Sequence, residues 1–272
     1  MVKDEPSRMN EIIKRFTEIL DAQGEADALE EIDTLMDELH LMIEQIDMAK
    51  VFTKFGGLTS LLLLLKSPRL STDLRAEAAG IIAAIAQNNY PVQEEMFKMK
   101  TVQMLVGIYA QCLSEPAVLR AKIIMAMSCV VRQHPPSEEL FMKDFAELVF
   151  SATVKMREPL VLRRAIFLGK ALLGSDSSTV ERVQSLAKCF LPSCLPYVIS
   201  ADHDLREGTL MMLQGFCSAP GGLDCIKAHK AAVVTAMNER EGSMLADAEM
   251  AEQEKSEMDL ARAIKATLAW DS

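Results

Sequence analysis

The sequence is poor in aromatic residues and in the residues that make tight turns. Aromatic side chains make up 5% of the 272 residues, with a single tryptophan, and there are only 12 glycines and 10 prolines. This scarcity argues against a β-sandwich or β-barrel, whose strands are rich in aromatic and β-branched residues and alternate with frequent turns. The 50% of apolar residues excludes a disordered chain. Because leucine, alanine, methionine, glutamate and lysine dominate, all of them strong helix formers, we expect an all-α fold.

The sequence also lacks a surplus of positive charge and a long apolar run. With 29 basic and 39 acidic residues the net charge is −10, whereas nucleic-acid-binding proteins carry a basic surplus or a basic patch, so we expect no nucleic-acid partner. The longest apolar run, around residues 61–65, is far shorter than the ~20 residues that span a bilayer. The first residues lack the apolar stretch of a secretory signal. We therefore expect no membrane association and a cytoplasmic protein whose six cysteines are free thiols.

A Leu-Arg pair recurs at regular intervals, at residues 74–75, 119–120, 162–163 and 205–206, which are 45, 43 and 43 residues apart. Each pair follows a short polar segment and opens a predicted long helix, after which a shorter and a medium helix are expected. Helical repeats of roughly 40–47 residues are typical of HEAT and armadillo proteins. The sequence therefore predicts an armadillo-type superhelical solenoid of about four three-helix repeats with helical caps. The third copy aligns about as well one position earlier.

The repeats divide the chain into four expected parts. Residues 1–22 are predicted to form a flexible N-terminal arm, 23–66 N-terminal capping helices, 67–242 the armadillo repeats and 243–272 a C-terminal capping helix. A helix docked on the first repeat is an equal alternative for the arm. Because charged terminal helices shield the ends of a repeat stack, we expect a monomer.

Catalytic signatures are absent from the sequence. There is no glycine-rich phosphate loop, no G-x-S-x-G turn and no H-E-x-x-H pair. The nearest metal-like set, Cys217, Cys225 and His229, matches no standard zinc spacing. We expect no catalytic residue, no metal and no cofactor, and thus a protein that is not an enzyme.

The recurring long helix is the one expected to line the concave surface of an armadillo solenoid, where this architecture binds protein segments. Its exposed side chains form a largely basic series in an acidic protein, which favours an acidic partner. An ordinary solvated face explains the same residues equally well. The series comprises Arg75, Glu77, Gln87, Lys122, Arg132, Arg163, Arg164, Arg206 and Glu207.

Three segments resemble the heat-shock-protein-70-binding exchange factors, which are the cytosolic Fes-type proteins and the related Sil-type proteins. Similar segments follow in order from about residue 25 to residue 240. The matching residues are IDMAKVF (46–52) with Gly56-Gly57-Leu58; Arg75 and Ala78 or Ala79 with Gln87-Asn88-Asn89 and Gln93; and Arg120, Lys122, Ala126, Ser128 and Arg132.

The resemblance implies a nucleotide exchange factor. Its armadillo core would bind the ATPase domain of the heat shock protein 70 (Hsp70) chaperone and promote the release of ADP, and its N-terminal arm would contact the chaperone's substrate-binding domain. The residues that the resemblance places on the partner-binding face are Arg75, Ala79, Lys122, Arg132, Arg164 and Glu207.

The alternative function is that of an armadillo adaptor, which binds an extended peptide segment of another partner. Adaptors of the nuclear-transport kind line their groove with tryptophan and asparagine. Here the corresponding positions hold Gly80, Ala84, Met125 and Cys129, and the only tryptophan is Trp270, in the tail. This difference favours the exchange factor.

Overall fold

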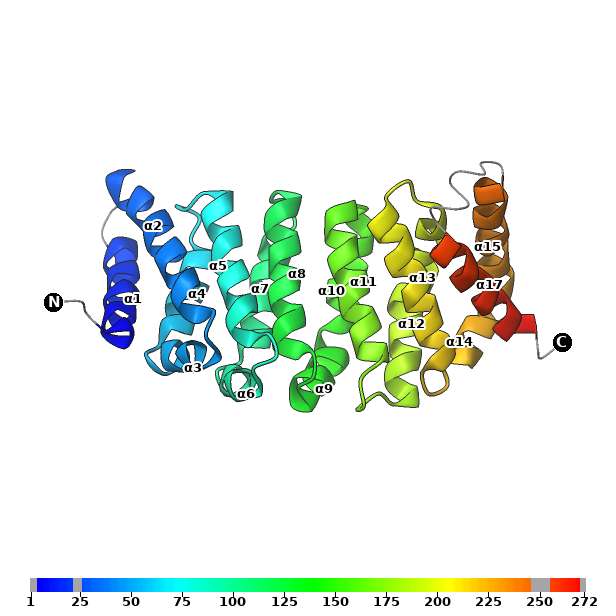
Figure 1. Ribbon diagram of the computed structural model, residues 1–272, viewed down its shortest axis with the longest axis horizontal. Coiled ribbons are helices and arrows are strands. Elements are labelled where there is room, and N and C mark those ends of the chain that lie inside the picture. Colours follow the sequence, from blue (N-terminus) through cyan, green and yellow to red (C-terminus); the bar gives the residue numbers. More distant parts are fainter. Residues whose placement is uncertain (1–3, 22–25, 246–254, 270–272) are drawn as a thin grey trace. The chain divides into compact units, whose positions relative to one another are not determined.

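The computed structural model describes residues 4–21, 26–245 and 255–269, and within these ranges the regular elements are all helices (Figure 1). The predicted all-α class is confirmed. Contacts divide the chain into two compact units, residues 1–138 and 139–272, which are described in turn. The elements are α1 (Glu5–Asp21), α2 (Ala26–Ile43), α3 (Ile46–Lys54), α4 (Gly57–Lys66), α5 (Thr72–Ala86), α6 (Tyr90–Lys98), α7 (Thr101–Gln111), α8 (Ala117–Val131), α9 (Pro135–Asp144), α10 (Ala146–Met156), α11 (Pro159–Leu173), α12 (Val180–Cys194), the 3₁₀ helix η1 (Leu195–Ile199), α13 (His203–Ser218), α14 (Gly222–Ala228), α15 (Lys230–Leu245) and α17 (Lys255–Ala269).

In the first unit, helices of different length alternate along the chain. A short, a medium and a long helix recur as α3, α4 and α5 and again as α6, α7 and α8. The long helices α5 and α8 lie side by side, while α4 packs against α5 and α7 against α8 (Figure 1). Five buried alanines in α5 allow this close approach between helices. Ser71 begins α5 as its N-cap, because its hydroxyl accepts a hydrogen bond of 3.2 Å from the backbone N–H of Leu74.

The N-terminal helix α1 is docked in the structure. It packs against α2 and α4 and buries one apolar face, which includes Ile12 and Phe16. Two bidentate ion pairs flank that face: Arg8 donates to Glu38 and Arg15 to Glu31, each through two bonds of 2.7 Å. These arginines lower the pKa of the two glutamates. Of the two arrangements left open by the sequence, the structure shows the docked helix, and a mobile arm that reaches a partner stays a prediction.

In the second unit, α10 packs against α11 and α12, and the long helices α11 and α13 pack against each other. Phe150 stacks on Phe190 with 4.5 Å between ring centroids and meets Phe141 edge-on at 6.0 Å, so aromatic side chains join α9, α10 and α12. Helix α17 packs on α13 and α15. It lies within the segment expected as the C-terminal capping helix, of which residues 246–254 and 270–272 fall outside the described ranges.

The Leu-Arg repeat marks the long helices, with one slip in register. Leu74, Leu119 and Leu205 are the third residues of α5, α8 and α13, and the repeat arginine is the fourth. In α11 the third residue is Val161 and the fourth is Leu162, so the alignment one position earlier is the structural one. All of these hydrophobic residues are buried.

Three of the four repeat arginines are scaffold residues. Arg75, Arg120 and Arg206 are buried, and each donates to a carbonyl oxygen in the segment that precedes its own helix. The bonds are 3.0 Å to Leu65, 2.9 Å to Glu115 and 2.8 Å to Ser200. Because a guanidinium keeps its charge in the interior and must be hydrogen-bonded there, each arginine ties the start of a long helix to the segment that precedes it.

Within the described residues, no single helix has the length and apolarity to cross a bilayer, although the bent pair α3–α4 passes the same test by length and composition alone. The same part of the chain contains no group of three or more histidine, cysteine or acidic side chains placed to hold a metal ion. The six cysteines are all free.

Candidate functional site: the exposed faces of the long helices

Two of the residues expected on an exposed binding face lie in the interior. Ala79 has no exposed surface. It is the eighth residue of α5, and the eighth residues of α8, α11 and α13 are also buried. Arg75 is 7% exposed and also bonds Glu115 and Cys112. The expectation that these two side chains face a partner is therefore wrong for this conformation, because both belong to the packing between repeats.

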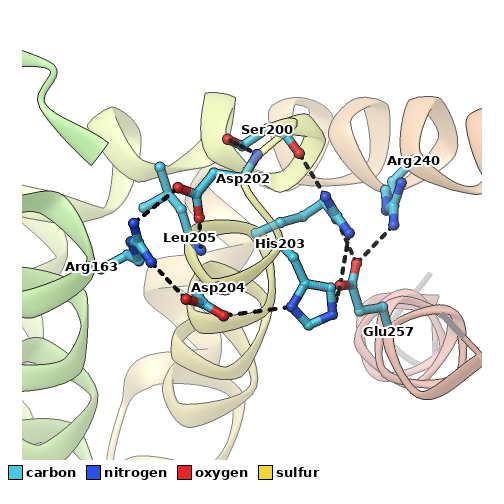
Figure 2. Close-up of polar contacts among 9 residues, drawn as sticks. Arg163, Ser200, Asp202, His203, Asp204, Leu205, Arg240 and Glu257 are labelled. Carbon is cyan, nitrogen blue, oxygen red and sulfur yellow. Dashed lines mark hydrogen bonds and ion pairs between the residues drawn. The ribbon is translucent and has the colours of Figure 1, made fainter. Parts of the chain in front are cut away.

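Arg206 was also expected among the exposed side chains, and this expectation is wrong as well. Its guanidinium binds the carboxylate of Glu257 on α17 through bonds of 2.7 and 3.1 Å, and Arg240 on α15 donates a third bond of 2.9 Å to the same carboxylate. Glu257 is 2% exposed. Figure 2 shows Glu257 as the meeting point of α13, α15 and α17. We call Arg206, Arg240 and Glu257 the α17 cluster.

In the first unit, the remaining candidates lie on and after α8. Lys122 is half-buried, and its Nζ lies 3.6 Å from the position that a Cβ on Gly80 would take, so the lysine side chain lies against α5 at this glycine. Arg132, directly after α8, bonds the Ser128 carbonyl at 3.2 Å. Glu77, also on α5, has its pKa raised by burial and by Asp37 and Asp33, while Lys122 opposes the shift.

In the second unit, α11 and α13 form a groove of about 360 Å³, which we call the α11–α13 groove. It brings together two of the expected residues, Arg164 and Glu207, although they lie 43 residues apart in the sequence. The groove also contains side chains that the sequence did not single out as functional. They include Phe167, Lys170, Asp204 and Met211.

The three cations of this groove differ in whether a carboxylate already pairs with them. Arg163 is paired with Asp204 at 2.6 Å and with Asp202 at 3.3 Å (Figure 2). Asp202 is held in turn, because it caps α13 by accepting a 3.0 Å bond from the backbone of Leu205. Arg164 is exposed and has no ion pair among the described residues. The Nζ of Lys170 contacts only the sulfur of Met211, at 3.4 Å, among the polar contacts that the structure gives it.

The missed groove residues on α11 carry a signal in the sequence. Leu160, Phe167 and Lys170 recur with Arg163 at intervals of three or four residues, which is the spacing of one helix face. Phe167 is 48% exposed, although an aromatic residue in a helix is easily mistaken for a core position. The groove can therefore offer positive charge and an apolar surface together.

Residues 48–173 match the family model described as the SIL1/FES1/HPBP1 C-terminal domain. Over these residues, a little under half of its length, the chain is similar to the SIL1/FES1/HPBP1 family. This SIL1/FES1/HPBP1 segment runs from α3 to the end of α11 and includes Lys122, Arg132 and Arg164. The resemblance inferred from the sequence motifs is confirmed.

Two curated proteins show the same similarity. The chain is 30% identical to a Gibberella zeae protein named Hsp70 nucleotide exchange factor FES1, over 48% of this chain and 61% of that protein. It is 29% identical to a Xenopus laevis protein named nucleotide exchange factor SIL1, over 50% of this chain and 27% of that protein. The matches span less than two thirds of either relative.

Solved structures extend the fold beyond the SIL1/FES1/HPBP1 segment. A designed armadillo repeat protein matches 96% of this chain and 99% of its own with a TM-score of 0.70 at 12% identity. A second one, in complex with a (KR)4 peptide, matches 94% of this chain and 99% of its own with a TM-score of 0.72 at 13% identity. At such identities the likeness shows the fold alone, and the predicted armadillo solenoid is confirmed.

Proposed function

We propose that this chain is a nucleotide exchange factor for Hsp70, which binds the chaperone's ATPase domain and promotes ADP release. The observation that carries the proposal is the family match of residues 48–173, together with relatives named as Hsp70 nucleotide exchange factors. The groove chemistry agrees with a protein partner, since exposed cations lie beside an apolar surface. In this proposal the protein acts as a monomer in the cytoplasm, and α1 is the segment that would contact the substrate-binding domain.

The contact residues in this proposal are Lys122 and Arg132 in the first unit and Arg164 and Glu207 in the second. Lys122 and Arg164 are both the sixth residue of their long helix, so the repeat presents a cation at the same position twice. Arg75 and Ala79 act behind this surface, because their burial keeps the long helices in place.

Exchange requires no chemical step by this protein. The factor must bind the open, nucleotide-poor state of the ATPase domain more tightly than the closed ADP state, since a ligand shifts an equilibrium only by its difference in affinity. By reciprocity, ADP must weaken the complex by the same factor. A titration of the complex with ADP therefore measures the factor by which this protein weakens the binding of ADP to Hsp70.

The test is the release of fluorescent ADP from purified Hsp70, measured by stopped flow with and without this protein. We expect release to accelerate with protein concentration and to saturate. Lys122→Glu should reduce the acceleration, whereas Lys143→Glu, an exposed change on α9, should not. Unchanged release in the presence of a folded wild-type protein would refute the exchange function, and binding to Hsp70 without acceleration would indicate an adaptor instead.

A further inference from the structure

The α11–α13 groove has a charge pattern that selects among partners. Of its three cations, Arg163 is already neutralised by Asp202 and Asp204, so it offers little further attraction to an incoming anion. Arg164 and Lys170 have no such carboxylate among the described residues. Both belong to α11, so the attraction for an anion is concentrated on one wall of the groove.

The two available cations are separated by an apolar centre. Arg164 and Lys170 are six positions apart in the sequence, which at 1.5 Å per residue is about 9 Å along the helix axis. Phe167 lies midway and is 48% exposed. Opposite this wall, Gly208 contributes no side chain, and a Cβ there would come within 3.4 Å of Ile166. The centre of the groove is thus apolar and is left open by a glycine.

The other wall discourages carboxylates. Glu207 on α13 lines the groove, and like charges brought together across an interface oppose binding. A segment with acidic side chains is therefore steered to the α11 wall. This combination therefore selects an acidic segment and directs its carboxylates to the α11 wall.

We propose that the α11–α13 groove binds a protein segment in which two carboxylates, about 9 Å apart, flank an apolar side chain. One carboxylate pairs with Arg164, the other with Lys170, and the apolar side chain packs on Phe167. The proposal rests on the proposed exchange function for the identity of the partner, since it specifies the surface that Hsp70 would present to this groove.

The first test measures the affinity of full-length protein for Hsp70 at 50 and 200 mM salt. Arg164→Glu and Lys170→Glu should each weaken binding at least tenfold and reduce its salt dependence, because each removes an ion pair and adds a repulsion. Glu207→Gln should strengthen binding two- to fivefold. The matched control Lys188→Glu, an exposed change on α12 outside the groove, should alter binding less than twofold. Circular dichroism confirms that each variant is folded.

A second test does not depend on Hsp70. The short peptide Gly-Glu-Gly-Leu-Glu-Gly is titrated into protein with labelled methionine and isoleucine methyl groups, and NMR shifts are followed. We expect the methyls of Met211 and Ile166 to shift, and the shifts to vanish in the Arg164→Glu, Lys170→Glu double variant. A control peptide with lysine in place of glutamate should leave them unchanged.

The two tests separate the failure of this inference from the failure of the exchange function. If the wild type binds Hsp70 but both charge reversals bind equally well, the groove proposal is overturned and the exchange function stands. If the wild type does not bind Hsp70, the peptide titration decides: shifts at Met211 and Ile166 support the groove chemistry, and their absence overturns it.

Discussion

Replacement of Glu257 by alanine is the most demanding test of how the second unit is held together. The carboxylate of Glu257 accepts two hydrogen bonds from Arg206 and one from Arg240, at 2.7, 3.1 and 2.9 Å. All three side chains are at least nine-tenths buried. Glu257→Ala therefore leaves two guanidinium groups in the interior without the carboxylate that neutralises them.

The expected loss follows from this arrangement. Removal of one partner of a buried ion pair lowers the free energy of unfolding by roughly 3–5 kcal/mol. At ~2–4 °C per kcal/mol, the unfolding midpoint should fall by about 6–20 °C. Hydrogen exchange should locate the loss in α17 and in the adjoining parts of α13 and α15, because these are the helices that the α17 cluster joins.

Two controls isolate the buried charge. Asp47→Asn removes an exposed pair with Lys50, in which Asp47 is 92% exposed, and should leave stability nearly unchanged because exposed pairs contribute little. Replacing Glu257, Arg206 and Arg240 together by leucine or methionine should recover most of the loss, since apolar residues often substitute for a buried charge cluster without penalty. A Glu257→Ala variant that loses less than about 1 kcal/mol, or a triple variant no better than the single one, would refute the reasoning.

Other outcomes follow from the same physical arguments. Burial raises the pKa of Glu77, so its ionised form is disfavoured in the folded state; Glu77→Gln should raise the unfolding midpoint at pH 7, and the gain should disappear as the pH falls toward the ordinary carboxyl range. The pKa values of Glu31 and Glu38 are lowered in the folded state. Their contribution to the free energy of unfolding is therefore present above the ordinary glutamate pKa and is lost as the pH falls through the folded-state values. At such pH the amides of α1 should lose hydrogen-exchange protection first, and a uniform loss along the chain would contradict this. Lys100 and Arg157 have φ angles of +58° and +53°; glycine at either position should stabilise the protein by about 0.5–1 kcal/mol in chemical denaturation, and a loss would show that the side chain matters more than the backbone. A reducing agent should leave the thermal midpoint unchanged, because all six cysteines are free; a large drop would indicate a disulfide.

The helical repeat could be predicted because its signals are local. Polar breaks, apolar periodicity and the Leu-Arg pairs lie within short stretches of sequence, and the helices form where these signals place them. The sequence also leaves two alignments open for the third repeat. The position at which α11 begins selects the one that is shifted by one residue.

The burial of individual side chains could not be predicted in the same way. Helices α5 and α8 are apolar on nearly every face, so hydrophobic periodicity does not reveal which side is exposed. Ala79 therefore looked as accessible as any alanine on a helix, and Arg75 looked exposed because it is charged. Lys170 is on α11 and Asp204 is on α13. Both line the groove only because these two helices pack against each other.

The scaffold arginines suggest how this repeat acquires new surfaces. In α5, α8 and α13 the fourth residue is a buried arginine that donates a hydrogen bond to a backbone carbonyl in the segment before its helix. In α11 that position is held by Leu162, and the arginine stands one place later, where it pairs with aspartates beside a groove. A shift of one position, about 100° around the helix, thus converts a structural residue into a surface residue without altering the composition of the repeat. In this chain, one long helix thus gains a charged side chain beside a groove, while the other three keep their buried arginine.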